Sequence, residues 1–356
     1  MKIFRILLFP FSIIYGLGVF FRNLAYDFKI VKTESFKNGI ISVGNLSSGG
    51  TGKSPLIEYL IRLLISEKKI ATLSRGYGRK TKGYVEVKTI SKPIEVGDEP
   101  LQFKIKFPEI EVAVDTDRVN GVKKLLQLTT PPDIILLDDA FQHRKINPGI
   151  SILLTDYNAI YTGDLLLPAG NLREMKSGAK RADIIVVTKV PQPFSPMEKR
   201  VMVERVSPLK HQSIFFSFIN YGNFTPLYSK ENIAMKSKEY YLENKFVILL
   251  FTGIASSVNL VDYLKAGGAL VKHIRFRDHH KYSSSDIRRI KQLFNNIATE
   301  KKLILTTEKD AVKLKNKDFE NSLKDFPIFY IPIFADFLNE DKRDFNEKIL
   351  DYAKKH

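Results

Sequence analysis

The 356-residue sequence contains no cysteine and no tryptophan. Without cysteine the chain can form neither a disulfide framework nor a thiolate metal site, so its chemistry depends on oxygen and nitrogen groups. It also has no internal repeat and no low-complexity segment. The 44% apolar and 27% charged residues are typical of a globular protein long enough for two domains, each with its own core.

Acidic residues are in the minority, with 39 Asp and Glu against 56 Lys and Arg, so the formal net charge is +17. Such a balance indicates an acidic partner: a nucleic acid, an anionic membrane surface or an anionic substrate. The basic residues are scattered along the chain and match no known nucleic-acid-binding motif. We therefore expect no nucleic-acid partner.

Residues 1–30 are expected to form an N-terminal membrane-interface helix. No charge occurs between Arg5 and Arg22. This run makes a helix of about 24 Å, shorter than the roughly 30 Å hydrocarbon core, and Pro10 weakens it further. No small-residue cleavage site follows, so a secretory signal is not expected. An interfacial helix fits better than a span, and the alternative is a helix packed on the protein's own core.

The stretch GIISVGNLSSGGTGKSPLIEYL, from Gly39 to Leu60, predicts a strand, a glycine-rich loop and a helix. Such a loop turns successive N–H groups toward a phosphate, and the positive end of the helix adds to the attraction. Lys53 would reach the β- and γ-phosphates, and Ser54 would ligate Mg²⁺. The alternative is a plain glycine-rich turn with a solvated lysine. The predicted nucleotide-binding residues are Ser47, Ser48, Gly49, Gly50, Thr51, Gly52, Lys53 and Ser54.

This loop departs from two related patterns. The motif GxxxxGK[ST] requires glycine where the chain has Ser47, and dimerising membrane ATPases carry a signature lysine where it has Ser48. The glycines nearest the phosphates remain. We therefore expect a modified phosphate loop that binds a nucleoside triphosphate.

A second motif, PPDIILLDDAFQHR, is an apolar strand that ends in Asp138 and Asp139. A carboxylate at the end of a buried strand, beside a phosphate loop, can hold or orient Mg²⁺. Two adjacent carboxylates repel each other unless a cation or solvent reaches them, so at least one is expected to bind metal. His143 is open between a ligand and a solvated or capping histidine.

Strands and helices alternate along the chain, which predicts an α/β fold. We expect a P-loop NTPase-type parallel-sheet lobe over residues 31–208 and a second, smaller α/β lobe over 209–356, joined by extended strands. The long loop LLLPAGNLREMKSGAKRAD is expected to carry substrate contacts, a structural loop being the alternative. Thr188 and Lys189 end a strand near where a nucleotide base could lie.

In this order, the motifs SVGNLSSGGTGKSP, GDEP, LDDAFQHR, LLPAGNLRE, FRDHHKY and TTEKDAVKL resemble those of the tetraacyldisaccharide 4'-kinases, which phosphorylate the lipid A precursor. The resemblance extends to about Leu314. It implies an ATP- and Mg²⁺-dependent kinase acting on the 4'-hydroxyl of a tetraacylated glucosamine disaccharide 1-phosphate, with the second lobe closing over the active site. It also implies peripheral or monotopic attachment to the cytoplasmic face of the inner membrane, and we expect a monomer.

The resemblance gives roles to individual residues. Asp98, otherwise a helix cap, matches the aspartate proposed to take the proton from the 4'-hydroxyl, and His279 matches the histidine that pairs with it. Lys53 belongs to the catalytic group as well. The metal ligands would be Ser54, Asp138, Asp139 and Gln142, and the acceptor-binding residues would be Arg118, Asn171 and Arg173. Two positions depart from the family pattern: Ala140 replaces an expected glycine, and Asn171 a frequent proline.

Two interpretations from other classes stay open on the residues alone. A nucleotide-switched membrane ATPase or GTPase would share the loop, the carboxylates and the helix, although the lysine at position 48 and a guanine motif are missing. A non-enzymatic membrane-surface binder would not need Lys53 and Ser54.

Overall fold

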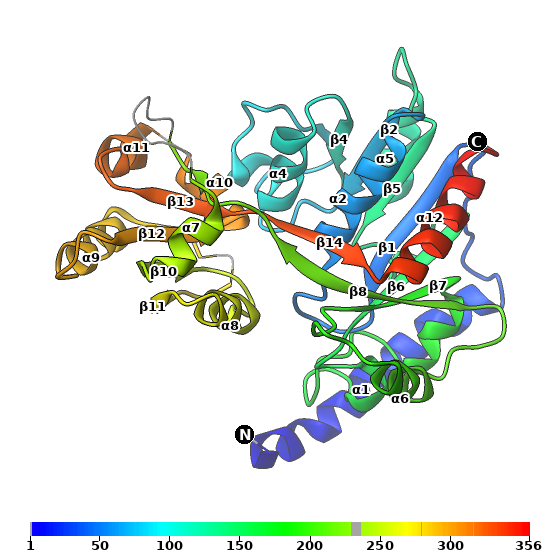
Figure 1. The fold of residues 1–356 in the computed structure, drawn as a ribbon. Coiled ribbons are helices and arrows are strands. Elements are labelled where there is room, and N and C mark those ends of the chain that lie inside the picture. The colour runs from blue at the N-terminus through cyan, green and yellow to red at the C-terminus, as the bar shows by residue number, and fades with distance from the viewer. Residues whose placement is uncertain (1, 229–235, 279, 316) are drawn as a thin grey trace. The chain divides into compact units, whose positions relative to one another are not determined.

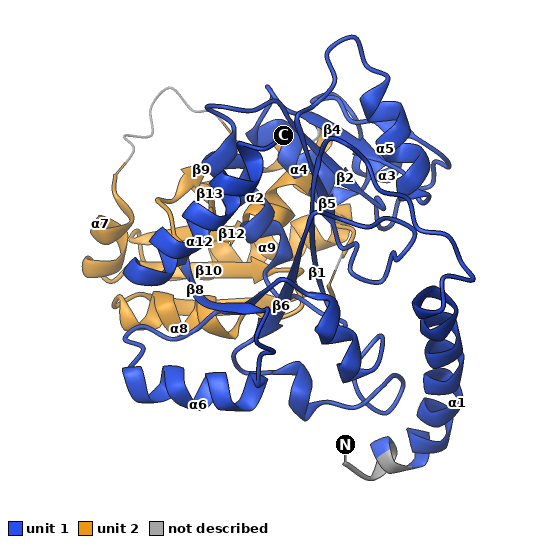
Figure 2. Ribbon diagram, turned by 90° about the vertical axis from the view of Figure 1, so that its right-hand side faces the viewer, with its two compact units in different colours: residues 1–219, 335–356 blue, residues 220–334 orange. Residues whose placement is uncertain are grey.

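The computed structural model describes residues 2–228, 236–278, 280–315 and 317–356 (Figure 1). The chain divides into two compact units, coloured separately in Figure 2. Unit 1 comprises Met1–Ile219 together with Ala335–His356, and unit 2 comprises Asn220–Phe334. The predicted catalytic residue His279 lies outside the described residues.

Unit 1 is built on a sheet that has nine strands within the described residues, in the order β14-β8-β7-β6-β1-β5-β2-β4-β3. Strands β4, β2, β5, β1, β6, β7 and β8 are parallel, and β3 is antiparallel to β4. The strands are β1 (Gly39–Asn45), β2 (Ile70–Ser74), β3 (Val85–Glu86), β4 (Glu111–Val114), β5 (Ile134–Asp138), β6 (Ile150–Asp156), β7 (Ile184–Thr188), β8 (Ser213–Tyr221) and β14 (Ile333–Phe337).

The central strands are buried on both faces, which explains their nearly continuous apolar sequences. Val43 of β1 pairs with Asp138 of β5. Because these strands are parallel, their carboxyl ends lie at one edge of the sheet, where ligands bind in such folds. The predicted phosphate loop and the paired aspartates are therefore at the same edge.

Helices follow most strands of unit 1. The α2 helix buries Leu56, Ile57, Leu60, Ile61 and Leu64, the stripe that its 3.6-residue periodicity predicts. The helices are α1 (Lys2–Asp27), α2 (Lys53–Leu64), α3 (Pro93–Val96), α4 (Asp98–Lys106), α5 (Arg118–Leu126), α6 (Pro196–Val206), α12 (Asn339–Ala353) and two 3-10 helices, Tyr161–Gly163 and Lys176–Arg181.

The C-terminal segment returns to unit 1. Strand β14 lies next to β8, and α12 packs near α2, where Tyr59 Oη donates a hydrogen bond to Asn346 Oδ1 at 2.7 Å. Tyr352 Oη of the same helix accepts one from Ile40 N at 2.9 Å. Since β8 also belongs to this sheet, the unit boundaries differ from the predicted lobe of 209–356. The alternation of strands and helices continues without a break up to the C-terminus, so this return could not be predicted from the pattern.

Unit 2 is a smaller α/β unit with the strand order β11-β10-β12-β13-β9. All its pairs are parallel except that of β9 with β13. Its strands are β9 (Thr225–Pro226), β10 (Val247–Thr252), β11 (Leu270–Arg275), β12 (Lys302–Thr307) and β13 (Ile328–Ile331). Its helices are α7 (Lys238–Glu243), α8 (Val258–Ala266), α9 (Ser284–Asn295), α10 (Glu308–Leu314) and α11 (Lys317–Leu323).

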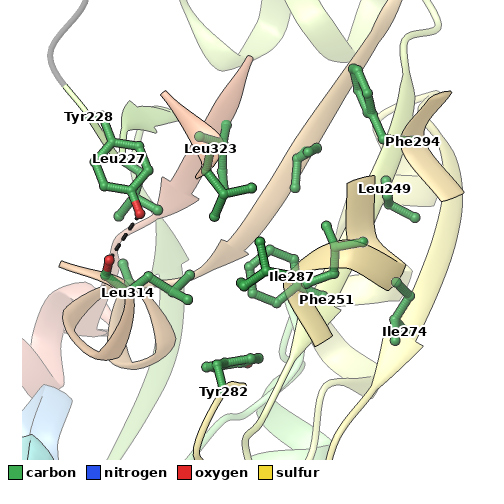
Figure 3. Packing of buried hydrophobic residues seen from close by; sticks show 14 of the residues in the cluster. Leu227, Tyr228, Leu249, Phe251, Ile274, Tyr282, Ile287, Phe294, Leu314 and Leu323 are labelled. Atoms are coloured by element: carbon green, nitrogen blue, oxygen red, sulfur yellow. Dashed lines mark hydrogen bonds between the residues drawn. The ribbon is translucent and has the colours of Figure 1, made fainter. Parts of the chain in front are cut away.

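One core of unit 2 is drawn in Figure 3. Phe251 from β10 and Ile287 from α9 are almost wholly buried in it. At its edge the Tyr228 hydroxyl donates a hydrogen bond to the carbonyl oxygen of Leu314 at 2.9 Å, which satisfies the polar end of an otherwise buried ring. Unit 2 thus has a hydrophobic core of its own.

Helix α1 is continuous over 26 residues although Pro10 lies inside it. It is longer than the uncharged run alone suggested. Its stretch Leu7–Asp27 is long and apolar enough to cross a membrane, by length and composition only. Figures 1 and 2 both show it at the periphery of unit 1. The large apolar side chains that it exposes are Leu7, Phe9, Phe11, Ile13, Ile14, Tyr15, Leu17, Phe20 and Phe21.

Candidate active site

The phosphate loop connects β1 to α2, as the sequence predicts. Gly49 has a φ of 118° and Gly52 a φ of 85°, a region that residues with a side chain rarely adopt. Gly52 is the residue before the first turn of α2, which begins at Lys53. The loop therefore leads directly into a helix N-terminus, whose free N–H groups attract anions.

The end of β7 supports this loop. Thr188 Oγ1 donates a hydrogen bond to the carbonyl oxygen of Thr51 at 2.8 Å. Lys189 Nζ donates to the carbonyl oxygen of Gly50 and lies 2.7 Å from Asp156 Oδ2. The sequence indicated only that Thr188 and Lys189 end a strand near a base. The structure adds that they hold the phosphate loop.

Asp139, directly after β5, is the centre of a charged cluster. Both its oxygens accept hydrogen bonds from Arg173, Nη1 to Oδ2 at 3.0 Å and Nη2 to Oδ1 at 2.7 Å. Lys53 Nζ is 3.7 Å from Asp139 Oδ1 and donates to Asn45 Oδ1 at 3.2 Å. Burial would raise the pKa of Asp139, but the hydrogen bonds from Arg173 and the charges of Lys53 and Arg173 outweigh it and lower that pKa.

Asp138 is in the opposite electrostatic situation. Its side chain is buried, and its Oδ1 atom has no hydrogen-bond partner among the described residues. Burial raises the pKa of Asp138, and the negative charges of Glu99 and Asp139 raise it further, against the opposing charges of Lys53 and Arg118. A divalent cation at this carboxylate would supply both the missing partner and the missing charge.

The residues present fit Mg²⁺ in particular. Thr51 Oγ1, in the loop itself, is also buried without a partner in the described part of the chain. No group of three or more His, Cys, Asp or Glu side chains that could hold a metal ion occurs among the described residues. Mg²⁺ is commonly bound by one or two carboxylates together with water and substrate phosphates, so it needs no such cage.

Arg118 begins α5 and is only 4% exposed. Its Nη1 donates to the carbonyl oxygen of Thr116 at 3.1 Å, while its Nε has no partner among the described residues. Burial lowers the pKa of Arg118 to about 10, and the negative charge of Asp138 opposes that shift. The guanidinium is still charged at neutral pH, and its positive charge acts to lower the pKa of both Asp138 and Asp139.

Asn171 and Arg173 belong to the long loop between β6 and β7, and the structure joins this loop to the phosphate loop. The carbonyl oxygen of Asn171 accepts a hydrogen bond from Ser48 N at 2.7 Å, and Arg173 N donates to Leu46 O at 2.7 Å. The Asn171 side chain donates to Asp164 Oδ2 at 2.9 Å. Two of the three predicted acceptor-binding residues, Asn171 and Arg173, thus lie beside the predicted nucleotide site.

Sequence reasoning missed Glu174, which is completely buried. Its carboxylate accepts hydrogen bonds from Gln142 Nε2 at 3.0 Å, from Arg181 Nη2 at 2.8 and 2.9 Å, and from Asn23 Nδ2 of α1 at 3.2 Å. Gln142 Nε2 also donates to the carbonyl oxygen of Asn45 at 2.8 Å. The side-chain oxygen of Gln142 is therefore the atom that could bind a metal. The signal available in the sequence was the place of Glu174 at the end of the motif LLPAGNLRE, directly after Arg173.

Asp98 is the first residue of α4 and is half-buried. The negative charge of its neighbour Glu99 raises the pKa of Asp138. The N-terminus of α4 is therefore near the carboxylate site. Because His279 lies outside the described residues, the pairing of Asp98 with His279 stays a prediction.

His143, which the sequence left open between a ligand and a solvated or capping histidine, is partly buried in the structure. Its Nε2 is buried and has no partner among the described residues. Burial lowers the pKa of His143 to about 4, helped by the positive charge of Arg118, so the ring is neutral at pH 7. It lines a cavity of about 280 Å³ together with Ser42 and Ser151, and none of the predicted site residues that the structure describes lines this cavity. This position excludes the predicted alternative of a fully solvated histidine.

Comparison with known proteins identifies the family. The family model for tetraacyldisaccharide-1-P 4'-kinase matches residues 4–354. The tetraacyldisaccharide 4'-kinase of Flavobacterium johnsoniae is 43% identical over 356 residues, covering 100% of this chain and 99% of that protein. The enzyme of the same name from Phocaeicola vulgatus is 42% identical over 351 residues, covering 98% and 95%.

A solved structure agrees with these sequence matches. The crystal structure of LpxK from Aquifex aeolicus in complex with ATP aligns with a TM-score of 0.74 at 30% identity. The alignment covers 98% of this chain and 99% of that one.

Proposed function

The chain belongs to the tetraacyldisaccharide-1-phosphate 4'-kinase family, and on that premise we propose how its own residues carry out the reaction. It is an ATP-dependent kinase of lipid A biosynthesis. The observation that supports the assignment of roles most strongly is the meeting of Lys53, the phosphate loop and the two aspartates at one edge of the unit 1 sheet.

The nucleotide would be held by residues 47–54 and by the N-terminus of α2. Lys53, which contacts Asn45 and Asp139, would turn its ammonium group to the β- and γ-phosphates. Ser54 and Asp138 would hold Mg²⁺, with Asp139 and Gln142 as the further ligands that the family resemblance indicates. Bound Mg²⁺ neutralises charge on the phosphates, and this chain's residues do the rest by positioning.

The acceptor side of the reaction needs one base. We assign that role to Asp98, which would accept the proton of the 4'-hydroxyl, and to His279 the role of stabilising that proton. Arg118, Asn171 and Arg173 would meet the anionic head of the acceptor. Arg173 has a second role that the contacts support directly, since its guanidinium neutralises Asp139.

A lipid acceptor requires access to a membrane surface, and α1 offers it. Its outward face carries Ile14 and Leu17, which are 69% and 50% exposed. The net charge of +17 favours an anionic leaflet, and the need for ATP favours its cytoplasmic side. We propose that α1 lies in the interface rather than crosses it, because Ser12, Tyr15 and Asn23 hydrogen-bond to the rest of unit 1 along its length.

The proposed domain roles follow. Unit 1 would bind the nucleotide and the membrane. Unit 2 would close over the active site during turnover. A monomer would suffice for binding and for closure. Closure would exclude water from the γ-phosphate.

The metal assignment is tested by equilibrium binding of a fluorescent ATP analogue with and without Mg²⁺. We expect Mg²⁺ to tighten binding of the analogue to the wild type. In Asp138→Asn or Ser54→Ala the increase in affinity caused by Mg²⁺ should be about tenfold smaller, equivalent to roughly 1.4 kcal/mol. Asp133→Asn is the matched control, since this aspartate precedes the same strand and accepts a hydrogen bond from Lys69 N at 2.8 Å. An unchanged Mg²⁺ effect in Asp138→Asn would remove Asp138 from the site.

A further inference from the structure

Helix α1 has a second face, directed at unit 1. Ser12 and Val19 are 3% and 8% exposed, and Gly16 is buried between them. Asn23 follows at the next helical repeat and is half-buried. These positions recur every three or four residues and form one stripe along the helix, apart from the apolar residues that face outward.

This inward stripe hydrogen-bonds to the loop between β6 and β7. Ser12 Oγ donates to the carbonyl oxygen of Leu166 at 3.0 Å and accepts from Ala169 N at 2.9 Å. Tyr15 Oη, at the edge of the stripe, donates to the carbonyl oxygen of Arg173 at 2.8 Å. The helix thus holds the part of this loop from Leu166 to Arg173 at both its ends.

The same loop holds the phosphate site. Ser48 N donates to the carbonyl oxygen of Asn171, and the guanidinium of Arg173 bonds to Asp139. Glu174, the residue after Arg173, is bonded on one side to Asn23 of α1 and on the other to Gln142. Only one loop therefore separates the lipid-facing helix from the phosphate loop and the predicted metal carboxylates.

We propose that the inward face of α1 is a positioning element for phosphoryl transfer, with Ser12, Gly16 and Asn23 as positioning residues that act through the loop Leu166–Glu174. This inference rests on the proposed function of α1 as the lipid-facing helix. A lipid surface that binds the outward face favours the docked helix, so it also favours the ordered loop and the assembled phosphate site. The enzyme is thereby more active at a lipid surface than recruitment alone explains.

The chain offers a matched pair of variants for the test. A Cβ atom at Gly16 would lie 2.8 Å from Leu166 Cδ1, whereas a Cβ at Gly18 would have nothing within 4 Å. Gly16→Leu and Gly18→Leu add the same apolar side chain to the same helix, but only the first places it against the loop, where the Leu166 side chain or the helix must shift to make room. Asn23→Ala removes one hydrogen bond to Glu174 without adding volume.

The first readout is steady-state transfer to detergent-dispersed acceptor, with thermal melting as the folding check. We expect Gly16→Leu to lower kcat about five- to tenfold, within the usual range of coupling between sites, while the KM for the acceptor stays the same. Gly18→Leu keeps the wild-type kcat. Asn23→Ala lowers kcat by a smaller factor, again with an unchanged KM for the acceptor. If Gly16→Leu does not fold, the kcat of Asn23→Ala tests the inference instead.

The second readout uses phosphatidylglycerol vesicles without acceptor and a fluorescent ATP analogue with Mg²⁺. We expect vesicles to tighten analogue binding to the wild type and to Gly18→Leu, and not to Gly16→Leu. Equal kcat and equal vesicle effects in both glycine variants would overturn the inference while leaving the kinase assignment intact. A wild type that transfers no phosphate to the lipid would overturn the assignment instead.

Discussion

Arg173 binds Asp139 with both terminal nitrogens of its guanidinium group, at 2.7 and 3.0 Å. This bidentate pair joins the long loop of unit 1 to the carboxyl end of β5. It also helps two neighbouring carboxylates to coexist there, because Arg173 neutralises Asp139, whereas Oδ1 of Asp138 has no hydrogen-bond partner among the described residues. The two aspartates therefore have different electrostatic roles.

The pair predicts that Arg173 cannot be replaced by lysine. Arg173→Lys keeps the charge but loses one of the two parallel hydrogen bonds, and Arg173→Ala loses both. The side chains are 25% and 36% exposed, so solvent screens the pair and we expect kcat/KM to fall by about tenfold for lysine and a hundredfold for alanine. Steady-state transfer assays measure this, and equal activity of Arg173→Lys and the wild type would contradict it.

Asp98 and His279 are predicted to act in proton transfer rather than in nucleotide binding. Asp98→Ala and His279→Ala should each lower kcat by roughly 10²- to 10⁴-fold, the usual contribution of a general base. Binding of the ATP analogue should stay within about twofold of the wild type, since neither residue belongs to the phosphate loop. If each variant left turnover intact, the dyad would be excluded.

Thr188 is predicted to stabilise the phosphate loop. Thr188→Val has nearly the same shape but leaves the carbonyl oxygen of Thr51 without its donor, which costs about 1 to 2 kcal/mol for a buried group. We expect ATP-analogue binding to weaken by about five- to twentyfold. Thr188→Ser retains the hydroxyl and should bind like the wild type, so a similar loss in both variants would point to packing rather than to this hydrogen bond.

The outward face of α1 is predicted to bind membranes. Replacing Ile14, Leu17 and Phe21 together by serine removes three exposed apolar side chains without touching the inward stripe. Partial burial in lipid should be worth about 1 kcal/mol or more for each, so recovery with anionic vesicles should drop by at least tenfold. Ile90→Ser, another exposed apolar position at 87%, is the control. Unchanged sedimentation of the triple variant would argue against this face.

Local patterns in the sequence predicted much of the fold. The apolar spacing of α2, the glycine-rich loop before Lys53 and the strand that ends in Asp138 each depend on neighbouring residues, and the structure has all three elements as expected. The alternation in unit 2 is of the same kind. Such signals are readable because hydrophobic periodicity and glycine conformation are local properties.

Contacts between distant segments could not be predicted. Asn23 and Glu174 are 151 positions apart, and although Glu174 ends the motif LLPAGNLRE, nothing in the sequence pairs it with Asn23. The apolar run predicts helix α1, but not the hydrogen bond from Ser12 to the carbonyl oxygen of Leu166, 154 positions later. The return of α12 to unit 1 is a third case, since its pairing partners lie some three hundred positions earlier.

This chain is a kinase of lipid A biosynthesis, and we propose that it transfers the γ-phosphate of ATP to its lipid acceptor through the loop that contains Lys53. The most direct test mixes the purified protein with ATP labelled at the γ-phosphate, Mg²⁺ and detergent-dispersed tetraacylated disaccharide 1-phosphate, and then separates lipid from water-soluble label. We expect label in the lipid, and its loss in Lys53→Ala. Label released only as free phosphate would contradict the account and indicate a nucleotide-switched ATPase.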